Sequence, residues 1–478
     1  MLLFLSMPQR LRTPRITKWL LPLQQLAIVL CLSGCFFSCS QEEQVTAKAR
    51  ARTVEIRKHQ GKFQLYRNGA PYFIKGAGGY EHFHKLKKAG GNSIRIWTTD
   101  NAEAVLDSAH RLGLTVTLGL KVANTGTEMD YSNTEAVAAQ REQIKQQVLR
   151  YKDHPALLMW GIGNEPTLYV NPSIVRPFSL IQHTRTWLAI DEIAAMIHDL
   201  DANHPTTTML QAVPGLTSFF INYFCDHLDV ISVNLFIPLE EQTLIDREIR
   251  KIGLKKPYVI SEYGNSGYWD EKRRTDWGAI TEQSSTRKGR ALQKFYQRYM
   301  HPENGNCLGS YVFYWGQKHE YTATWFSLFT ENGEATEMTD VLQYLWTGSW
   351  PVNKAPSIYS IRVNNHKPNR NMYLQANKRY QVQVEAKGNA PDSLVLYWEL
   401  VQDDTELVEL FYHAQHNQAK PAVMQSGRML VAAARQQKGL YAFPFTAPGQ
   451  EGPYRLFVYL RNQYGKVATA NTTLYLLP

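Results

Sequence analysis

The sequence predicts a (β/α)8 TIM barrel over residues 54–350, followed by a C-terminal, immunoglobulin-like β-sandwich over residues 356–478. Two observations lead to this prediction. In the first region, short apolar runs alternate with amphipathic stretches, which is typical of parallel strands joined by helices. In the second region, short runs that alternate polar and apolar residues are separated by Gly, Pro and Asn, which is typical of an antiparallel sandwich.

A β-hairpin is expected to lead into the barrel. Residues 62–67 and 71–75 have the composition of strands, and the pair Asn68-Gly69 lies between them. Asn-Gly between two such runs indicates a two-residue turn, because both residues accept the positive φ angles that the turn requires.

Eight strands make up the predicted barrel. They are expected at residues 72–77, 92–97, 114–120, 156–162, 206–211, 229–234, 257–262 and 308–314. The clearest helix is 135–151, whose apolar residues fall on one stripe, and a last helix is expected near 336–346. A doubly wound open sheet is the alternative. That fold requires a glycine-rich phosphate-binding turn after the first strand, and Gly76-Ala-Gly78-Gly79 lacks the third glycine of the motif.

The C-terminal region contains the expected strands of the sandwich. Its clearest alternating runs are residues 380–384, 393–398, 454–459 and 468–477. This region either binds glycan or serves as a packing or spacer module, and the sequence leaves both alternatives open.

Residues 1–34 are predicted to be an export signal. Basic residues come first, and the apolar stretch 20–32 that follows is too short for a membrane span. The segment ends in Leu-Ser-Gly-Cys, which resembles a bacterial lipobox, so cleavage would precede Cys35 and its thiol would carry the lipid. Cys39 is a second candidate anchor, and an ordinary secretory signal is the alternative. With residues 35–53 as a flexible tether, the protein is expected to be a membrane-anchored lipoprotein of the cell envelope, facing the periplasm or the cell surface.

Charge and cysteine content give no support for nucleic-acid or metal binding. The formal net charge is +10, but four of the basic residues lie in the predicted signal and no concentrated basic block follows. Cys225 and Cys307 are the cysteines of the predicted folded body, and the sequence leaves open whether they pair. No CxxC or zinc-ligand pattern is present. Neither a metal nor an organic cofactor is expected, since the chemistry proposed below needs only carboxyl groups and water.

Two of the apolar strands lead into a glutamate at their carboxyl end. Strand 156–162 leads into Asn164-Glu165-Pro166, and strand 257–262 ends at Glu262. The carboxyl ends of barrel strands form the edge at which barrel enzymes carry their chemistry, so we expect both side chains at one rim. Cleavage of a glycosidic bond requires such a pair of carboxyl groups, with one protonated and one charged.

The sequence around each glutamate is also specific. Asn164-Glu165-Pro166 and Ser261-Glu262-Tyr263-Gly264 together resemble the motifs of the retaining glycoside hydrolases of clan A. The segment from Phe63 to Gly69, followed by Ile74-Lys75-Gly76, is similar to the start of the family 2 barrel. Family 5 is the nearest competitor, because its members favour Asn-Glu-Pro. The resemblance covers residues 54–346.

The resemblance implies a role for each matched residue. Glu165, on the fourth strand, matches the general acid/base, and Glu262, on the seventh, matches the nucleophile. Asn164 matches the residue that hydrogen-bonds the 2-hydroxyl of the sugar, and Arg95 matches the arginine that supports the nucleophile. Trp315, on the eighth strand, matches the aromatic platform on which the sugar packs. A structural ion pair remains the alternative for Arg95, and core packing remains the alternative for Trp315.

One position departs from the family pattern. The sixth strand would usually end in Asn-x-Tyr, with the tyrosine hydroxyl touching the nucleophile, whereas this chain has Asn234-Leu235-Phe236. The hydroxyl is therefore missing unless Tyr263 or another residue supplies it.

The expected function is that of a retaining β-glycosidase that hydrolyses an envelope or extracellular polysaccharide or oligosaccharide. A transglycosidase that remodels a β-glucan with the same glutamates is one alternative, and longer products than substrates would identify it. A non-catalytic glycan-binding envelope protein is the other, and saccharide binding without hydrolysis would identify it.

Overall fold

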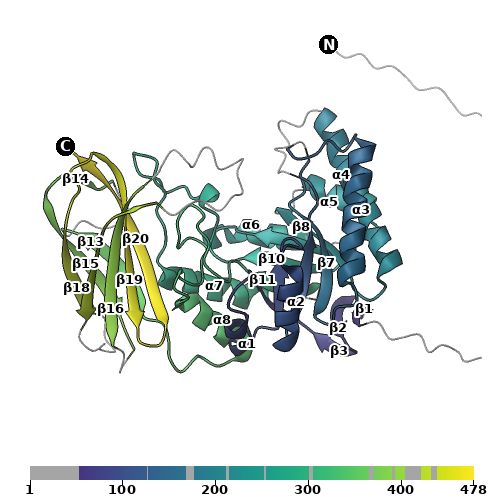
Figure 1. Ribbon diagram of the computed structural model, residues 1–478, viewed down its shortest axis with the longest axis horizontal. Helices are drawn as coiled ribbons and strands as arrows, with labels where there is room; N and C mark the ends of the chain where they lie inside the picture. The colour runs from purple at the N-terminus through teal and green to yellow at the C-terminus, as the bar shows by residue number, and fades with distance from the viewer. Residues whose placement is uncertain are drawn as a thin grey trace, which may run out of the picture. The chain divides into compact units, whose positions relative to one another are not determined.

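The computed structural model describes residues 53–125, 127–167, 177–211, 215–251, 255–300, 305–364, 371–389, 393–403, 421–431 and 439–478. Its larger part is a closed barrel of eight strands, shown in Figure 1 with the helices that surround it. The strand order around the barrel is β10-β11-β4-β5-β6-β7-β8-β9, and neighbouring strands are parallel. The predicted TIM barrel is thereby confirmed, and the open-sheet alternative is wrong.

The barrel strands lie close to the predicted positions. They are β4 (Ile74–Gly78), β5 (Ser93–Ile96), β6 (Thr115–Leu120), β7 (Leu157–Asn164), β8 (Thr206–Gln211), β9 (Val230–Leu235), β10 (Tyr258–Tyr263) and β11 (Cys307–Val312). Nearly every residue in them is buried, because one face of each strand fills the barrel and the other packs against helices. This burial on both faces explains why the sequence shows continuous apolar runs here.

Helices connect the strands. They are α1 (Phe83–Lys88), α2 (Ala102–Arg111), α3 (Thr134–Tyr151), α4 (Pro177–Leu200), α5 (Gly215–Phe224), α6 (Gln242–Lys251), α7 (Ser285–Tyr299) and α8 (Glu337–Thr347). In α3, Ile144, Val148 and Tyr151 are buried at helical spacing, and the side chain of Asn133 caps the helix by accepting a hydrogen bond from the backbone of Ala136.

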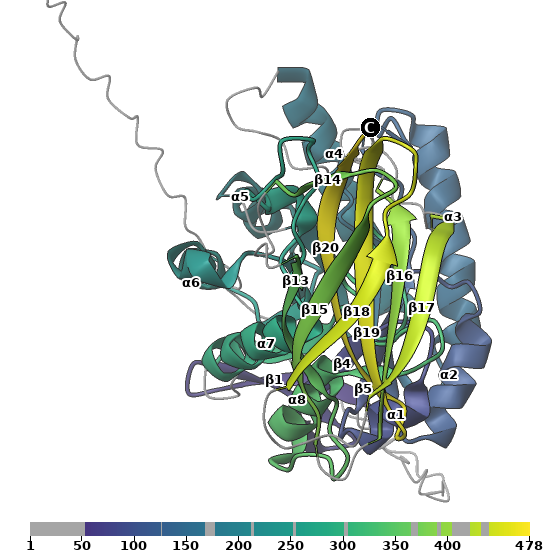
Figure 2. The ribbon, with the colours of Figure 1, turned by 90° about the vertical axis from the view of Figure 1, so that its left-hand side faces the viewer.

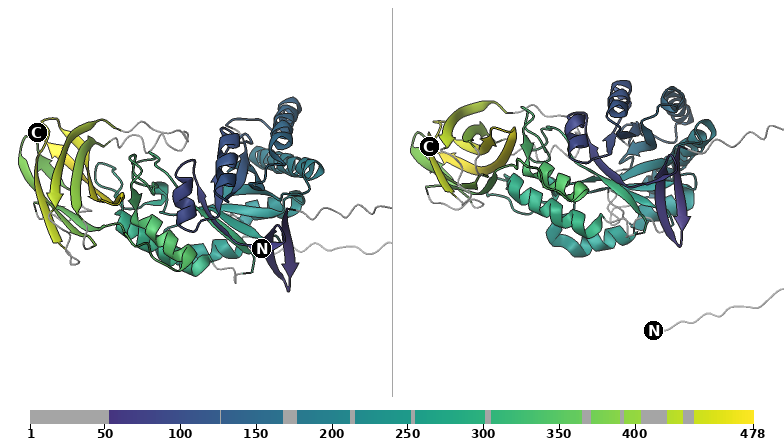
Figure 3. Two further views of the ribbon diagram at one scale, coloured as in Figure 1. Left: turned by 60° about the horizontal axis from the view of Figure 1, so that its bottom comes forward. Right: turned by 90° about the horizontal axis from the view of Figure 1, so that it is seen from below.

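The amino-terminal end of the barrel is covered by a three-stranded sheet of β1 (Val54–His59), β2 (Lys62–Arg67) and β3 (Ala70–Tyr72). Figure 3 shows these strands in purple beside the barrel. Asn68 and Gly69 have φ angles of 51° and 78°, as the predicted turn requires. Leu65 packs against residues near the starts of several barrel strands, such as Leu158 and Leu308. This end is therefore closed, which leaves the opposite rim for a site.

The C-terminal region folds into two packed, mainly antiparallel sheets, which Figure 2 views from the side of this domain. One sheet has the order β12-β20-β19-β16-β17, with β14 on β20, and the other has the order β13-β15-β18. The strands are β12 (Ala335–Thr336), β13 (Ser357–Val363), β14 (Tyr373–Gln375), β15 (Arg379–Lys387), β16 (Leu394–Gln402), β17 (Val423–Val431), β18 (Gly439–Thr446), β19 (Gly452–Asn462) and β20 (Lys466–Leu477). The inward residues of both sheets form one core, as expected for a sandwich.

Some predictions concern residues outside the described part of the chain. The export signal, Cys35, Cys39 and nearly all of the tether are among them. No helix within the described residues is long and apolar enough to cross a membrane. Cys225 and Cys307 are both described, and each is a buried free thiol, so the pairing that the sequence left open is not formed.

Candidate active site

Glu262 lies near the carboxyl end of β10, buried beneath the open rim of the barrel with only 6% of its surface exposed. Arg95, from β5, donates to its Oε1 from Nη1 over 2.6 Å, and the indole Nε1 of Trp97 donates to the same oxygen over 2.9 Å. Arg95 itself is 1% exposed and also donates to the backbone carbonyl of Ser261 over 3.0 Å. The carboxylate therefore has a fixed cationic partner and a second hydrogen-bond donor on the same oxygen.

Arg95 also links Glu262 to the end of β7. Its Nη2 donates to Oδ1 of Asn164 over 2.6 Å. Because the amide oxygen of Asn164 accepts this bond, its Nδ2 group is the part that can donate to a ligand. One guanidinium thus orients the side chains from two different strands, so the predicted group of Arg95, Asn164 and Glu262 is brought together.

Glu165 follows directly after β7, where the chain turns sharply. Its φ angle of 51° is in the left-handed region, and its backbone N–H donates to the carbonyl of Met209 over 2.8 Å. The carboxylate Oε1 accepts a 2.7 Å bond from Nδ2 of Asn234, at the end of β9. Asn234 is in turn oriented by the hydroxyl of Ser261, which donates to its Oδ1 over 2.9 Å. Glu165 therefore has a neutral amide as its partner, in contrast to Glu262.

The surroundings of Glu165 raise its pKa to about 7. Removal from water is the largest cause, and the charge of Glu262 is the second. The hydrogen bond from Asn234 and the charge of Arg95 oppose the increase, while Glu320 adds to it. A carboxylic acid that stays protonated near neutral pH, beside a carboxylate held by an arginine, is the pairing that general acid catalysis with a nucleophile requires.

Aromatic side chains surround the carboxyl groups. The ring of Trp97 stacks at 5.9 Å on Tyr314 and meets Phe313 edge-on at 5.8 Å. Phe236 contacts Phe313 edge-on at 5.5 Å, and Trp269 meets Phe236 edge-on at 5.7 Å. Such rings present apolar faces to the C–H groups of a sugar. No group of His, Cys, Asp and Glu side chains in the described residues is arranged to hold a metal ion.

The structure does not support the predicted sugar platform at Trp315. This ring is 1% exposed, packs against Phe329 at 5.1 Å and Trp346 at 6.2 Å, and donates from Nε1 to the carbonyl of His82 over 3.3 Å. Its faces are covered by core side chains, so the core-packing alternative is correct. Among the described aromatics, Trp97 donates to Glu262, and Tyr314 stacks on Trp97.

We expect Trp315→Ala to lower the free energy of unfolding by about 3–5 kcal/mol, because it leaves a large cavity in the core. Urea denaturation followed by fluorescence would measure this loss. Trp315→Phe should fold and keep the KM of the wild-type protein, since the ring does not reach the site. A KM that rises strongly in the stable Phe variant would contradict this assignment.

The tyrosine hydroxyl expected near Glu262 is not supplied by Tyr263. That side chain is buried and stacks on Phe295 of α7 at 5.7 Å, on the outer side of the barrel, because successive strand residues point to opposite faces. Phe236 is part of the aromatic cluster instead. Trp97, rather than a tyrosine hydroxyl, donates to Oε1 of Glu262.

Two residues that contact the carboxyl groups were not assigned a role from the sequence. Asn234 holds Glu165, and Trp97 holds Glu262. The signal for Asn234 was present, since it is a polar residue near the end of the apolar strand β9, like the two glutamates near the ends of theirs. Trp97 follows β5 directly, two residues after Arg95, and is therefore on the same face of the strand.

Comparisons with known proteins agree with this barrel. The family model for glycosyl hydrolases family 2, TIM barrel domain, matches residues 81–336. The β-glucuronidase of Mus musculus is 26% identical over 232 residues, which are 45% of this chain and 33% of that protein. The β-glucuronidase of Paenibacillus borealis is 23% identical over 236 residues, which are 41% of this chain and 36% of that protein. The chain therefore spans about a third of the length of these relatives.

Solved structures of similar proteins are also found. Bacteroides uniformis β-glucuronidase 2, covalently bound to cyclophellitol-6-carboxylate aziridine, is 15% identical with a TM-score of 0.48, and the match covers 89% of this chain and 48% of that one. The β-glucuronidase of Ruminococcus gnavus is 16% identical with a TM-score of 0.46, over 62% of this chain and 53% of that one. The family model spans more than half of the chain, and on that basis the chain belongs to glycosyl hydrolases family 2, through its TIM barrel domain.

Proposed function

We propose that this protein is a retaining β-glycosidase. The observation that carries the proposal is the contrast between two glutamates joined by one hydrogen-bond network. Glu262 is ion-paired with Arg95 at 2.6 Å, whereas Glu165 has an amide partner and a pKa raised to about 7. At neutral pH one carboxyl group can thus attack while the other donates a proton.

In the first step, a carboxylate oxygen of Glu262 attacks the anomeric carbon of a β-linked sugar. The bond from that carbon to the leaving oxygen breaks, and the proton of Glu165 passes to the leaving oxygen. The products are a glycosyl ester on Glu262 and the free aglycone alcohol. We expect Nδ2 of Asn164, whose Oδ1 accepts from Arg95, to donate to the sugar 2-hydroxyl as positive charge develops at the anomeric carbon.

In the second step, Glu165 is charged and accepts a proton from a water molecule. The oxygen of this water attacks the anomeric carbon, and the ester bond to Glu262 breaks. The sugar leaves with its original β configuration, Glu262 returns to the carboxylate held by Arg95, and Glu165 is again protonated. Water is the only reactant consumed besides the glycoside, and both carboxyl groups are regenerated.

The substrate that we propose is a β-linked oligosaccharide or polysaccharide met outside the cytoplasm. We also propose that the protein reaches this location through the predicted export signal and is held there by a lipid on Cys35. The curated relatives are named β-glucuronidases, so a β-glucuronide belongs among the substrates to be tested. The panel of substrates described next, and not the name of a relative, identifies the sugar that this protein accepts.

A panel of 4-nitrophenyl β-glycosides, with glucoside, galactoside, mannoside, xyloside and glucuronide, tests the proposal. We expect turnover of at least one β-glycoside and none of the matching α-glycoside. Proton NMR of the first product should show the β-anomer before mutarotation, and a first product of α configuration would contradict retention. If no compound is turned over while calorimetry detects saccharide binding, the non-catalytic alternative is correct.

The same enzyme preparation separates hydrolysis from transfer. Incubation with β-glucan and mannan oligosaccharides should give products shorter than the substrate. Products longer than the substrate would identify the transglycosidase alternative, in which a sugar hydroxyl replaces water in the second step. Both outcomes use Glu165 and Glu262 in the same roles.

A further inference from the structure

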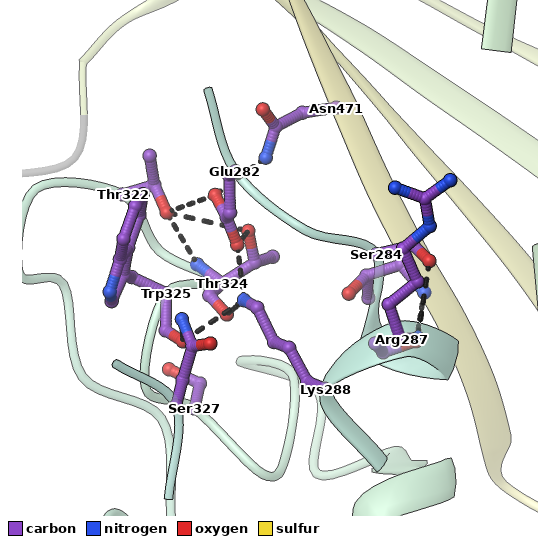
Figure 4. Close-up of polar contacts among 12 residues, drawn as sticks. Glu282, Ser284, Arg287, Lys288, Thr322, Thr324, Trp325, Ser327 and Asn471 are labelled. Atoms are coloured by element: carbon purple, nitrogen blue, oxygen red, sulfur yellow. Dashed lines mark hydrogen bonds and ion pairs between the residues drawn. The ribbon is translucent and has the colours of Figure 1, made fainter. Parts of the chain in front are cut away.

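The C-terminal sandwich contacts the barrel through a buried polar cluster. We name it the junction cluster, and it consists of Glu282, Lys288, Thr322, Thr324, Arg455 and Asn471. Glu282, Thr322 and Thr324 are in segments that follow barrel strands β10 and β11, Lys288 is in α7, and the last two residues are in β19 and β20. Figure 4 shows most of these side chains converging on Glu282.

Glu282 is the centre of the junction cluster. Its carboxylate accepts bonds from Lys288 at 2.5 Å, Thr322 at 2.7 Å and Thr324 at 2.8 Å, all from the barrel domain. The fourth donor is Nδ2 of Asn471 in the sandwich, at 2.6 Å. The side chains of Glu282 and Lys288 are each 1% exposed. A buried carboxylate with four donors has little freedom to move, so Asn471 holds the segment that carries Glu282.

Arg455 makes the second connection across the junction. Within the sandwich it donates to both carboxylate oxygens of Asp403, at 2.9 and 3.1 Å, and to Oδ1 of Asn471 at 2.9 Å. From the same guanidinium, Nη2 donates to the carbonyl of Ile280 at 3.1 Å and to the hydroxyl of Tyr321 at 3.0 Å. Arg455 is 1% exposed. It therefore links the sandwich to both barrel segments at once.

These two segments form part of the rim of the candidate active site. Residues 264–282 follow the strand of Glu262, and residues 313–325 follow β11. They are tied together, since Nε1 of Trp325 donates to the carbonyl of Ser266 over 2.9 Å and Tyr268 stacks on Tyr321 at 5.4 Å. The ring of Tyr268 also contacts Trp269, and ring contacts continue from Trp269 through Phe236 and Phe313 to Trp97.

We propose that the sandwich is a structural part of the active site, in which Arg455 and Asn471 are positioning residues that fix the two rim segments beside the catalytic pair. The inference rests on the proposed function, because it assigns the role of these segments in that same site. It also goes beyond the two roles that the sequence left open for the sandwich, which are glycan binding and a packing or spacer module. A spacer would need no charged side chains directed into the barrel segments.

The composition of the junction favours positioning over simple adhesion. A buried ion pair contributes little net stability compared with apolar residues of the same size, but it requires one geometry. Arg455 binds its partners through a bidentate contact and three further bonds, so a displaced segment would leave charged groups buried without partners. The junction thus holds one arrangement of the rim and disfavours others.

Arg455→Met tests the proposal, because methionine keeps the apolar stem and removes every donor. Arg461→Met is the matched control. Arg461 is in the same strand and pairs with Glu334 at 3.0 Å, outside the two rim segments. Tyr321→Phe is a milder second variant that keeps the ring stacked on Tyr268 and removes the hydroxyl that contacts both Arg455 and the backbone N–H of Ile280. It keeps the test decisive if Arg455→Met does not fold.

Hydrogen–deuterium exchange of the full chain gives the first readout, and it does not depend on activity. We expect faster exchange in peptides covering 264–282 and 313–325 in Arg455→Met and, to a smaller extent, in Tyr321→Phe. Peptides from α2 and α3 should be unchanged, and Arg461→Met should match the wild-type protein in both rim segments. Unchanged exchange of the rim segments in a folded Arg455→Met or Tyr321→Phe variant would overturn the proposal.

Steady-state kinetics give the second readout, with the aryl β-glycoside that the wild-type protein turns over. A small displacement of the rim should lower kcat/KM by about 10- to 100-fold in Arg455→Met.

The pH profile gives a third readout. The groups that act on the charge of Glu165 are Glu262, Arg95, Asn234 and, from the rim, Glu320. Displacement of Glu320 should move the alkaline limb of the pH profile to lower pH, which a uniform loss of stability would not do.

The outcomes distinguish this inference from the proposed function. If the wild-type protein is active and Arg455→Met has the kcat/KM and pH profile of Arg461→Met, the positioning role is wrong and the glycosidase assignment stands. If the wild-type protein turns over no glycoside, the proposed function fails. Faster exchange in the rim segments would then still show that the sandwich holds them, but the proposal of an active-site role would be overturned.

Discussion

Glu262→Ala should lower kcat for the best aryl β-glycoside by on the order of 10⁴-fold, or about 5.5 kcal/mol in the activation free energy. The variant lacks the oxygen that forms the glycosyl ester, while Arg95, Asn164 and Glu165 remain in place to bind the sugar. Initial rates at saturating substrate would measure the loss. We expect KM to change far less than kcat, because the removed group acts mainly in the bond-forming step.

Two controls make this result specific to Glu262. Glu103→Ala removes an exposed glutamate of α2 that pairs with Arg150 and should leave kcat unchanged. Adding azide to Glu262→Ala should restore part of the turnover and give an α-glycosyl azide, since a small anion can enter the space left by the carboxylate. Wild-type turnover by Glu262→Ala would remove Glu262 from the mechanism.

Glu165→Ala should show a loss that depends on the leaving group. For a natural sugar aglycone, which needs a proton as it departs, kcat/KM should fall by about 10²- to 10⁴-fold. For a 2,4-dinitrophenyl glycoside, whose leaving group departs without a proton, formation of the glycosyl-enzyme should be nearly unaffected. A series of aryl glycosides of increasing leaving-group pKa would measure this difference. An equal loss across the series would contradict the role of acid.

The pH dependence follows from the same residue. The protonated form of Glu165 is the acid, and its pKa is raised to about 7, so kcat/KM of the wild-type protein should fall as the pH rises through that region. Glu165→Ala should lose this alkaline limb, because the titrating group is gone. An unchanged alkaline limb in the variant would assign the titration to another group.

Much of the barrel could be predicted because its signals are local. The Asn68-Gly69 turn and the apolar strands that lead to Glu165 and Glu262 each depend on residues adjacent in sequence. Strand β1 was not predicted, because Val54–His59 has mostly polar, part-exposed residues and is held by pairing with β2. Pairing of this kind depends on tertiary context rather than on propensity.

The site was predictable to the extent that its residues end strands. Glu165, Glu262, Asn164 and Arg95 meet as the motifs implied, whereas Trp315 does not. A tryptophan after the last strand can turn toward the rim or toward α8, and only the packing of Trp346 and Phe329 around it decides between the two. The contacts between the sandwich and the rim were also beyond prediction, because Arg455 and Glu282 are far apart in the sequence.

The central claim is that Glu262 carries the sugar during turnover, and covalent trapping tests it most directly. A 2,4-dinitrophenyl 2-deoxy-2-fluoro-β-glycoside of the sugar that the enzyme accepts should slow release of the glycosyl-enzyme and increase the intact mass by one fluorosugar. Peptide sequencing by mass spectrometry is expected to place this label on Glu262. A label on another residue, or turnover of the parent substrate with no trapped intermediate and an α-configured first product, would contradict the account.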